Sequence, residues 1–465
     1  MERVSQHPGS GSPGTAGARR TVAIVGAGAA GTLSAVALAR AARAARTPLE
    51  ILLLDRRDFG PGVAYSTPDP LHTLNVPARD MSAFADEPDD FVQWRRRRGS
   101  DGGPRDFAPR AEYGEYLRDV LHGALGEAGG VALRTRTAEV RALHRQNRGF
   151  VLALAGGETV ACDEAVLALG TFPPGDTPGL APEALAHPRH VADPWAPGAL
   201  DAVRDDGLAV LVGSGLTMVD VALTLARRAP RLHLHAISRN GLLPHAHDPA
   251  LPPRAAPVVA PGASLAATAR ALREAPGPWR PVVDGLRPVA AELWQGFDAA
   301  DRRAFLAGHA RRWDVLRHRM PPAVATAIGE LRAAGRLTTT RASVAAIRPE
   351  RHGLAVWRAG EPAPLPAAWV VNCTGPCADV TRVRDPLVAH LLASGHARPH
   401  PLGLGLDTAG GAVLDARGGR TGGLWTLGSL RRGELYETTA LPEIRRQAAE
   451  LGARLARGVA EPLAA

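Results

Sequence analysis

The first part of the chain alternates between apolar runs and a glycine-rich turn. Thr21–Val25 is a short apolar run rich in β-branched residues, three glycines follow it, and an alanine- and leucine-rich stretch continues to about Ala45. The run favours a strand and the stretch favours a helix. A second apolar run, Leu49–Leu54, ends in Asp55. The pattern therefore predicts a strand–helix–strand unit with a glycine turn after its first strand.

The same order of elements returns in the middle of the chain. Leu208–Val212 predicts a strand, Gly213–Gly215 a turn, Thr217–Arg228 a helix and Leu232–Ile237 a second strand. The Pro- and Gly-rich stretch 173–198 precedes this unit and is typical of a connection between domains. The unit is thus repeated within one chain.

The remaining pattern predicts further strands, a helical segment and a closing helix. Residues 264–333 carry mostly helical spacing, and Pro442–Leu455 predicts a last helix that packs back on the first domain. Apolar runs predict the remaining strands at Ala165–Leu169, Val344–Ile347, Leu354–Trp357, Trp369–Val371 and Leu424–Leu427.

These elements predict a two-domain α/β protein. We expect residues 181–364, with a helical segment over 250–335, to be inserted into a domain formed by residues 19–180 and 365–465. Residues 1–18 are rich in Gly, Ser and Pro without apolar periodicity, so we expect a disordered leader there.

Composition narrows the class of protein. With 465 residues, 45% of them hydrophobic and 22% charged, the chain has average globular usage, and no apolar stretch approaches the roughly 18 residues of a membrane span. We expect a cytoplasmic protein without a membrane partner, because the N-terminal stretch also lacks the apolar core of a secretory signal.

The basic excess consists of arginine alone. All 55 basic residues are arginines, and they give a net charge of +9. Only Arg95–Arg98 form a run, and no aromatic residues interleave it as a single-strand binder would need, so we expect a solvated helix end and no nucleic-acid partner. Without lysine, any anion must be held by arginine, histidine or backbone N–H groups.

Cysteine and histidine spacing gives no metal or disulfide pattern. Cys162, Cys373 and Cys377 are odd in number and fit no zinc or thioredoxin spacing, so we expect packing residues. His233 and His235 form an H-x-H pair, but alternation along a strand accounts for it and no carboxylate or cysteine completes a ligand set. We therefore expect no metal.

The first glycine turn fits the dinucleotide-binding pattern G-x-G-x-x-G. Gly26 allows the tight turn, Gly28 lets a pyrophosphate approach the helix N-terminus, and Gly31 permits close packing of helix on strand. Asp55 ends the second strand, where an acid accepts hydrogen bonds from ribose hydroxyls. Because strand, turn, helix, strand and acid follow in order, we predict a Rossmann-like domain here.

The second glycine turn departs from the pattern in two ways. Gly213 and Gly215 are kept and Thr217 opens the helix, but Met218 stands at the third glycine position. Arg239 stands near the end of the second strand, where the first unit has its acid. A cation there suits a 2′-phosphate, so the unit predicts a second Rossmann-like domain that prefers NADPH. A vestigial domain without nucleotide stays open as the alternative.

Several further segments carry a family resemblance. With the two glycine turns, the chain resembles the FAD/NAD(P)-binding proteins related to the amino-acid N-hydroxylating flavoprotein monooxygenases. The resembling segments outside the turns are 60–65, 72–77, 238–244, 371–376 and 427–445. They span most of the chain and specify the family much more than the substrate.

The resemblance implies where the cofactors lie. FAD would lie across the first domain, with residues 60–77 under the isoalloxazine, and the junctions at Leu169–Thr171 and Cys373–Gly375 would join the domains. Gly428 would end the last strand of the FAD domain, and Glu437, Thr438 and Thr439 would lie near the pyrimidine side of the flavin. Many relatives have an acid directly after that glycine, whereas this chain has Ser429, so ribityl contacts would come from elsewhere.

The resemblance also implies a reaction. NADPH would reduce FAD, dioxygen would add at flavin C4a, and an amine would attack the resulting hydroperoxide. The chain has only 20 aromatic residues (8 Trp, 4 Tyr and 8 Phe), so a small polar amino acid fits better than a large hydrophobic substrate. Nitrosuccinate synthases, which oxidise the amine of L-aspartate, are the relatives that fit an arginine-rich site.

Candidate substrate residues follow from the resembling segments. Arg431 and Arg432 are the expected carboxylate binders, with a solvated basic turn as the alternative, and His72 and Asn75 are candidates for flavin or substrate contacts, with a structural histidine as the alternative for His72. Glu437 completes the catalytic set. Two other functions stay open: a flavin oxidoreductase without oxygen insertion, and a nucleotide-sensing binding protein. The expected partners are the amino acid and dioxygen, and self-association is left open.

Overall fold

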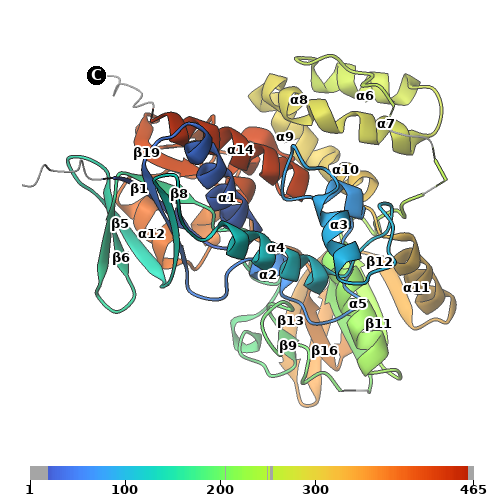
Figure 1. Ribbon diagram of the computed structural model, residues 1–465. Coiled ribbons are helices and arrows are strands. Elements are labelled where there is room, and N and C mark those ends of the chain that lie inside the picture. Colours follow the sequence, from blue (N-terminus) through green and yellow to red (C-terminus); the bar gives the residue numbers. More distant parts are fainter. Residues whose placement is uncertain (1–18, 205, 249, 252–254, 459–465) are drawn as a thin grey trace, which may run out of the picture.

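The computed structural model describes residues 19–204, 206–248, 250–251 and 255–458. The predicted leader, residues 1–18, lies outside the described residues. The chain forms two mixed α/β units, the second inserted into the sequence of the first, and a group of helices lies beside both (Figure 1).

The first domain is built on an eight-stranded sheet. Its central strands are parallel, with β1 between β2 and β8, and the order across the sheet is β17-β18-β19-β8-β1-β2-β4-β3. The strands are β1 (Arg20–Val25), β2 (Leu49–Asp55), β3 (Gly126–Ala128), β4 (Val131–Thr137), β8 (Glu164–Leu167), β17 (Thr408–Ala409), β18 (Ala412–Leu414) and β19 (Arg420–Thr426). Both halves of the predicted split domain thus contribute to one sheet.

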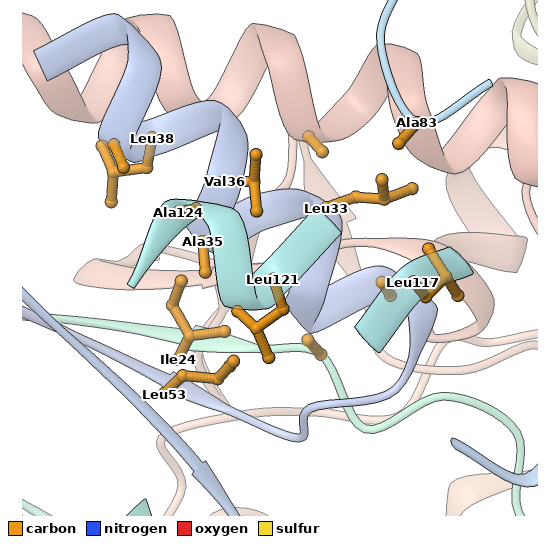
Figure 2. Packing of buried hydrophobic residues seen from close by; sticks show 14 of the residues in the cluster. Ile24, Leu33, Ala35, Val36, Leu38, Leu53, Ala83, Leu117, Leu121 and Ala124 are labelled. Atoms are coloured by element: carbon orange, nitrogen blue, oxygen red, sulfur yellow. The ribbon is translucent and has the colours of Figure 1, made fainter. Parts of the chain in front are cut away.

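Helices cover one face of this sheet. α1 lies on the central strands between α4 and α14, and Figure 2 shows Leu33 and Val36 of α1 with Leu117 and Leu121 of α4. The helices of this domain are α1 (Ala29–Ala44), α2 (Gly62–Tyr65), α3 (Asp90–Arg97), α4 (Arg110–Ala124), α12 (Pro386–Ala393), α13 (Arg432–Leu435) and α14 (Leu441–Arg457). The prediction that the last helix returns to the first domain is confirmed, because α14 packs along α1.

A small antiparallel sheet covers the opposite face. It consists of β5 (Val140–Arg145), β6 (Phe150–Leu154) and β7 (Thr159–Cys162). Alternate residues of β6, Phe150, Leu152 and Leu154, are buried with Ala23 and Val25 of β1. This period of two is the reason why the strand buries one face and exposes the other.

The second domain repeats this layered arrangement. A five-stranded parallel sheet has the order β12-β11-β10-β16-β9, and the hairpin strands β13, β14 and β15 cover one of its faces. The strands are β9 (His190–Val191), β10 (Leu208–Val212), β11 (His233–Ser238), β12 (Leu337–Arg341), β13 (Val344–Glu350), β14 (Gly353–Arg358), β15 (Leu365–Ala367) and β16 (Trp369–Asn372). α5 (Leu216–Arg228) and α11 (Pro322–Ala333) cover the other face.

One predicted domain boundary is wrong. We expected the chain to return to the first domain at residue 365, but β16 pairs with β10 inside the second sheet, so the return comes after Asn372. The two crossing segments meet each other, since Phe172 and Cys377 form an antiparallel bridge. An apolar run such as Trp369–Val371 predicts a strand but not the sheet that it joins.

The predicted helical segment is present between β11 and β12. It contains α6 (Leu265–Glu274), α7 (Trp279–Gly285), α8 (Ala290–Gly296), α9 (Ala299–Gly308) and α10 (Ala310–Arg317), followed by α11. Trp294 and Phe305 of this segment pack with Leu404 and Tyr436 of the first domain. In Figure 1 these helices form a layer at one end of the molecule. The inserted segment therefore contacts the first domain near its last strand.

Candidate active site

The first glycine turn has the geometry that its sequence predicts. Gly26 has a φ of +98°, and a Cβ there would lie 2.4 Å from the carbonyl oxygen of Ala168. A Cβ on Gly31 would lie 1.7 Å from the carbonyl oxygen of Gly26. Only glycine fits these two positions, so α1 begins directly against the turn and its N-terminal N–H groups are close to the backbone of the loop.

Asp55 holds this turn from the end of β2. Its Oδ2 accepts a hydrogen bond from the backbone N–H of Ala27 at 2.6 Å, and its Oδ1 accepts one from that of Arg57 at 2.9 Å. A surface hollow of about 750 Å³ opens beside it, lined by Arg56, Arg57, Asp58, Phe59, Arg118 and Thr137. This hollow at the carboxyl ends of β2 and β4 is where a dinucleotide of a Rossmann-like domain places its adenosine.

The segment after β2 folds back on the glycine turn. The N–H of Gly60 donates to the carbonyl of Ala27 at 2.8 Å, and a Cβ on Gly28 would lie 3.2 Å from Cα of Gly62. The lack of side chains at Gly28 and Gly62 leaves two stretches of backbone facing each other, which is the kind of cradle that a pyrophosphate occupies.

The structure gives His72 a different place from the predicted one. His72 is 5% exposed, its Nδ1 lies 2.6 Å from Oγ1 of Thr67, and its Nε2 lies 2.9 Å from Oγ1 of Thr224 on α5. Thr224 donates its own proton to Asp69, so Nε2–H of His72 donates to Thr224. Both ring nitrogens are engaged, Nδ1 within the first domain and Nε2 across to the second, so the expected flavin or substrate contact is corrected to a structural one.

The same interface holds a buried ion pair. Arg110 of α4 donates to the carboxylate of Asp220 on α5 at 2.9 Å, with both side chains largely buried. Burial raises the pKa of Asp220, although Arg110 and His72 oppose that shift. We refer to Asp69, His72, Arg110, Asp220 and Thr224 as the interdomain network. It fixes α5, and with it the second glycine turn, against the first domain.

Asn75 lies beside the inserted segment. Its backbone carbonyl lies 3.0 Å from Nε2 of His247, and the ring of His247 packs on Phe107 at 4.9 Å between centroids. Burial, with Arg319 nearby, lowers the pKa of His247 to about 4. The imidazole is thus neutral and donates to Asn75. The predicted role of the Asn75 side chain stays a prediction.

The second glycine turn is built like the first but is looser at its third position. Gly213 has a φ of +121°, and a Cβ there would lie 2.2 Å from the carbonyl oxygen of Cys373. Met218 takes the third position and is fully buried in the core of this domain. The turn can therefore accept a side chain where the first turn cannot.

An arginine that the sequence gave no reason to single out lies on this second turn. Arg311 of α10 donates through Nη2 to the carbonyls of Ser214 and Leu242, at 3.0 and 2.8 Å, and its Nη1 would lie 3.8 Å from a Cβ on Gly215. A guanidinium at a helix N-terminus complements an anion that also contacts the backbone N–H groups. Arg311 thus places a cation against the turn where a pyrophosphate is expected.

The end of the second strand carries positive charge. Arg239 is exposed directly after β11. Arg341, at the end of the neighbouring strand β12, is also exposed and pairs with Ser238. Ser238 Oγ lies 2.7 Å from Ser214 Oγ and accepts from the N–H of Gly241. Thr217 is half-buried in the first turn of α5. β2 of the first domain ends in an acid, Asp55, whereas β11 ends in Ser238 and is followed by an arginine.

The last strand of the first domain leads into the start of α14. The N–H of Gly428 donates to Gln447 at 3.0 Å, and Thr438 donates to the carbonyl of Gly428 at 3.0 Å. Thr439 is exposed just before the helix. Ser429 donates to the carbonyl of Gly170 in the crossing segment. Gly428 and Thr438 fix this loop, and Thr439 is the side chain left facing outward.

Arg431 does not have the free guanidinium that we expected. It is 8% exposed and forms two hydrogen bonds with the carboxylate of Glu434, at 3.0 and 2.9 Å. Glu434 also accepts from Thr408 and from the N–H of Gly410. Arg431 therefore stabilises the fold of this loop. The expectation that it binds a substrate carboxylate is wrong, because Glu434 already occupies its guanidinium group. Arg432 is half-buried, with its guanidinium 5.1 Å from the ring centroid of Tyr436.

Glu437 is held in place by an unusual backbone turn. Tyr436 has φ +56° and ψ −64°, and the N–H of Glu437 donates to the carbonyl of Leu435 at 2.7 Å. This is a classic-type γ-turn, a strained conformation for a residue with a side chain. The ring of Tyr436 is packed against Trp294 and Phe305 at 4.9 and 5.0 Å, which holds the turn.

Glu437 faces α10 of the inserted segment. Its Oε1 accepts from Nε1 of Trp313 at 2.5 Å and lies 3.8 Å from Nε2 of His318, and its Oε2 lies 4.0 Å from Nε of Arg317. We call this meeting of residues 313–318 with 436–443 the junction. Burial lowers the pKa of His318 and raises that of Asp314. The junction brings an acid, an imidazole and a buried arginine together beside the start of α14.

The cysteines are free and show no sign of reactivity. Cys162 and Cys373 are buried, and burial raises the pKa of Cys162 to about 12 and that of Cys373 further. Such thiols stay protonated and are poor nucleophiles. In the described part of the chain, no three His, Cys, Asp or Glu side chains group as a metal site would, and no helix there could cross a membrane.

The run Arg95–Arg98 is paired within the first domain. Arg95 is buried against Glu112 at 2.9 Å, and Arg98 lies 2.8 Å from Glu115. The prediction of a solvated helix end is therefore wrong for Arg95, because α4 supplies a carboxylate for it.

Comparison with known proteins agrees with this architecture. Residues 23–172 match the protein family described as FAD-NAD(P)-binding. No curated protein sequence matches the chain. The match covers the first glycine turn, Asp55 and the whole of the first half of the FAD-type domain.

Solved structures share the fold over the whole chain. The ornithine N-hydroxylase of Kutzneria sp. 744, described with reduced FAD, NADP⁺ and L-ornithine, has a TM-score of 0.66 at 15% identity, covering 95% of this chain and 100% of that one. The FAD-bound cadaverine monooxygenase of Erwinia amylovora has a TM-score of 0.65 at 13% identity, covering 96% of each chain. The bacillithiol disulfide reductase of Bacillus cereus has a TM-score of 0.54 at 12% identity, covering 95% of this chain and 100% of that one.

The chain therefore has the fold of flavin enzymes with two dinucleotide-binding domains. At these identities the likeness concerns the fold, and the structures that share it carry out both N-hydroxylation and disulfide reduction. The choice between these chemistries has to come from the side chains of this protein.

Proposed function

We propose that the protein is an FAD- and NADPH-dependent monooxygenase that oxidises the amino nitrogen of a small polar amino acid. L-Aspartate, with nitrosuccinate as the product, is the leading candidate for the substrate. The observation that carries the proposal is the pair of glycine turns in one fold, with Asp55 as the last residue of the second strand in the first domain and Ser238 followed by Arg239 at the corresponding strand end in the second.

The residues present fit the two cofactors. Gly26, Gly28 and Gly31 would hold the FAD pyrophosphate, and Asp55 and the hollow beside it would hold the adenosine. Gly213, Gly215, Thr217 and Arg311 would hold the NADPH pyrophosphate and Arg239 its 2′-phosphate. Gly428 and Thr439 would lie at the flavin. When bound, FAD reduced by NADPH supplies the activation of dioxygen.

The protein's own tasks are then to bind, to orient and to exclude water. An amine must lose its proton before it can act as a nucleophile, and a neutral imidazole beside it can accept that proton. His318 has such an imidazole, with Glu437 3.8 Å from its Nε2 to stabilise the charge that it gains.

Reduction of a disulfide is the competing chemistry on this fold. It needs a thiol that ionises readily, whereas burial raises the pKa of Cys373, and Cys377 hydrogen-bonds to the carbonyl of Asp379. These contacts favour N-oxidation over a cysteine-based reductase.

One assay tests the proposed function. The purified protein with FAD, NADPH and oxygen is offered L-aspartate and a panel of other amino acids, while NADPH consumption, hydrogen peroxide and oxidised nitrogen are followed, the last by mass. We expect one amino acid to stimulate NADPH consumption and to gain oxygen on nitrogen. Peroxide without oxidised nitrogen across the panel would point to an oxidoreductase, and no stimulation by any of them would point to a binding protein.

A further inference from the structure

Arg317 is a buried cation whose hydrogen-bonding groups are incompletely used. It is 8% exposed, and its Nε and Nη2 have no hydrogen-bond partner among the described residues. The nearest carboxylate oxygens are those of Glu437, at 4.0 Å from Nε, and Glu443, at 3.8 Å from Nη2. Buried guanidinium groups are normally fully hydrogen-bonded, so this position requires a partner.

The two neighbouring acids are already engaged elsewhere. Glu443 accepts two hydrogen bonds from Arg287, at 2.6 and 2.9 Å, and Glu437 accepts one through Oε1 from Trp313. Burial would raise the pKa of Glu443, but the bonds and charge of Arg287 outweigh it and the pKa is lowered. Neither acid can therefore move to Arg317 without breaking a shorter contact.

The other cations of the region have partners of their own. Arg319 pairs with Asp284, and Arg431 pairs with Glu434. Nε of Arg319 also lacks a partner, but its Nη2 bonds to Asp284, whereas Arg317 has two unpartnered nitrogens and no carboxylate within hydrogen-bond distance among the described residues.

The surroundings of Arg317 also offer acceptors for a cation. Oε2 of Glu437 has no hydrogen bond from the described residues, and Asp314 is half-buried one turn earlier on α10. His318 is 31% exposed, so the junction is open on that side. Unpaired donors and an unpaired carboxylate oxygen about 4 Å apart are complementary to a molecule that carries both a carboxylate and an ammonium group.

We propose that Arg317 binds the carboxylate of the amino-acid substrate at the junction, in the role first expected of Arg431. Nε and Nη2 form the two parallel hydrogen bonds of an arginine–carboxylate pair, and Oε2 of Glu437 receives the ammonium group. The inference rests on the proposed function, because it takes an amino acid as the ligand. It narrows the substrate to amines that keep a free carboxylate and excludes simple diamines.

Binding to the full-length protein loaded with FAD tests this assignment. L-Aspartate, L-ornithine and cadaverine are titrated by calorimetry into the wild type and into Arg317→Gln, Arg317→Lys and Arg312→Gln. Arg312 is exposed on the same helix and serves as the matched control. FAD content and the melting temperature of each variant report whether it is folded.

We expect the wild type to bind at least one of the two amino acids at least tenfold more tightly than cadaverine. Arg317→Gln should weaken that amino acid at least tenfold and leave cadaverine unchanged, Arg317→Lys should recover part of the loss, and Arg312→Gln should change nothing. If Arg317→Gln does not fold, the preference of the wild type for a carboxylate and the partial loss in Arg317→Lys still decide the matter.

Three results would overturn the assignment: no binding of either amino acid by the wild type, equal binding of cadaverine, or wild-type affinity in a folded Arg317→Gln. The outcome is separable from the proposed function. Amino-acid binding through Arg317 without oxidised nitrogen would refute the monooxygenase and keep the carboxylate site. Oxidation of a diamine at the same rate in the wild type and in Arg317→Gln would support the monooxygenase and refute the carboxylate site.

Discussion

The two glycine turns start alike and end differently. Gly26 and Gly213 both have positive φ and both lie against a backbone carbonyl of a later strand end. At the third position, Gly31 of the first turn has no room for a Cβ, whereas the second turn buries the whole side chain of Met218. The first glycine therefore fixes the turn, and the third fixes how closely the helix approaches it.

The difference extends to how each turn is held. Asp55 closes the first turn through a backbone N–H of the same domain, whereas Arg311 reaches the second turn from the inserted helices. A tight turn with a local acid suits a cofactor that stays bound. A looser turn that is contacted by a separate segment suits a cofactor that binds and is released in each catalytic cycle.

The largest effect is expected from substitution at the third glycine position of the first turn, on the FAD that the protein retains. Gly31→Ala places a Cβ 1.7 Å from the carbonyl oxygen of Gly26, so α1 must move away from the turn, and FAD retained after purification should fall at least tenfold, on the order of 1.4 kcal/mol or more. Met218→Ala should leave a cavity costing about 2 to 5 kcal/mol of stability but no loss of FAD. Flavin absorbance and urea unfolding of both variants measure this, and normal FAD content in Gly31→Ala would contradict the comparison.

The second largest effect is expected from Asp55, on the affinity for FAD. Asp55→Ala removes the acceptor of the Ala27 N–H at 2.6 Å and the expected ribose partner, so FAD affinity should fall about tenfold. Asp58→Ala changes an exposed acid in the same hollow and should leave FAD affinity unchanged. Titration of the apoprotein with FAD measures both, and equal affinities would remove the role of Asp55.

The charge at the second turn should set the choice of nicotinamide. Arg239→Ala removes the exposed cation after β11, so KM for NADPH should rise about tenfold while KM for NADH stays the same. Arg351→Ala, an exposed arginine in the β13–β14 turn, is the control. If Arg239→Ala left the ratio of the two KM values unchanged, the 2′-phosphate would be bound elsewhere, and Arg341 would be the next residue to test.

The smallest effect concerns the contact of the inserted segment with Asn75. Burial lowers the pKa of His247 to about 4 from 6.5, so the unfolded chain binds the proton first and the folded protein loses stability as pH falls from about 6.5 to 4, by roughly 3 kcal/mol. His247→Gln can still donate to Asn75 but does not titrate. Urea midpoints at pH 4.5 and 7 should differ less in the variant, and equal differences would rule out His247 as the cause.

The local pattern of apolar and polar residues was sufficient to predict most of the strands and helices. Leu208–Val212 was predicted to the residue, and Thr21–Val25 and Leu49–Leu54 to within one residue, because each is a buried run next to a glycine or an acid. It was harder to predict which sheet a strand joins. Trp369–Val371 was predicted as a strand but assigned to the wrong domain, because its pairing with β10 joins residues about 160 apart in the sequence.

The site could be predicted only where its chemistry is local. The glycine turns and Asp55 lie within one supersecondary unit, so their local geometry could be predicted, while their contacts with a cofactor stay a prediction. His72 and Arg431 were misjudged because their partners, Thr224 and Glu434, could be recognised only once the chain was folded. Arg311 and Arg317 were missed because arginines are so numerous around α10 that nothing in their spacing separates a buried one from an exposed one.

Helix α10 links the two domains, because one end contacts the second glycine turn and the other end contacts the first domain. Arg311 and Arg317 are six residues apart, about 9 Å along the helix axis, with Arg311 on the second glycine turn and Arg317 beside Glu437. A shift of either residue in so short a helix displaces the other as well. Under the proposed function, nicotinamide binding at Arg311 would therefore be coupled to amino-acid binding at Arg317.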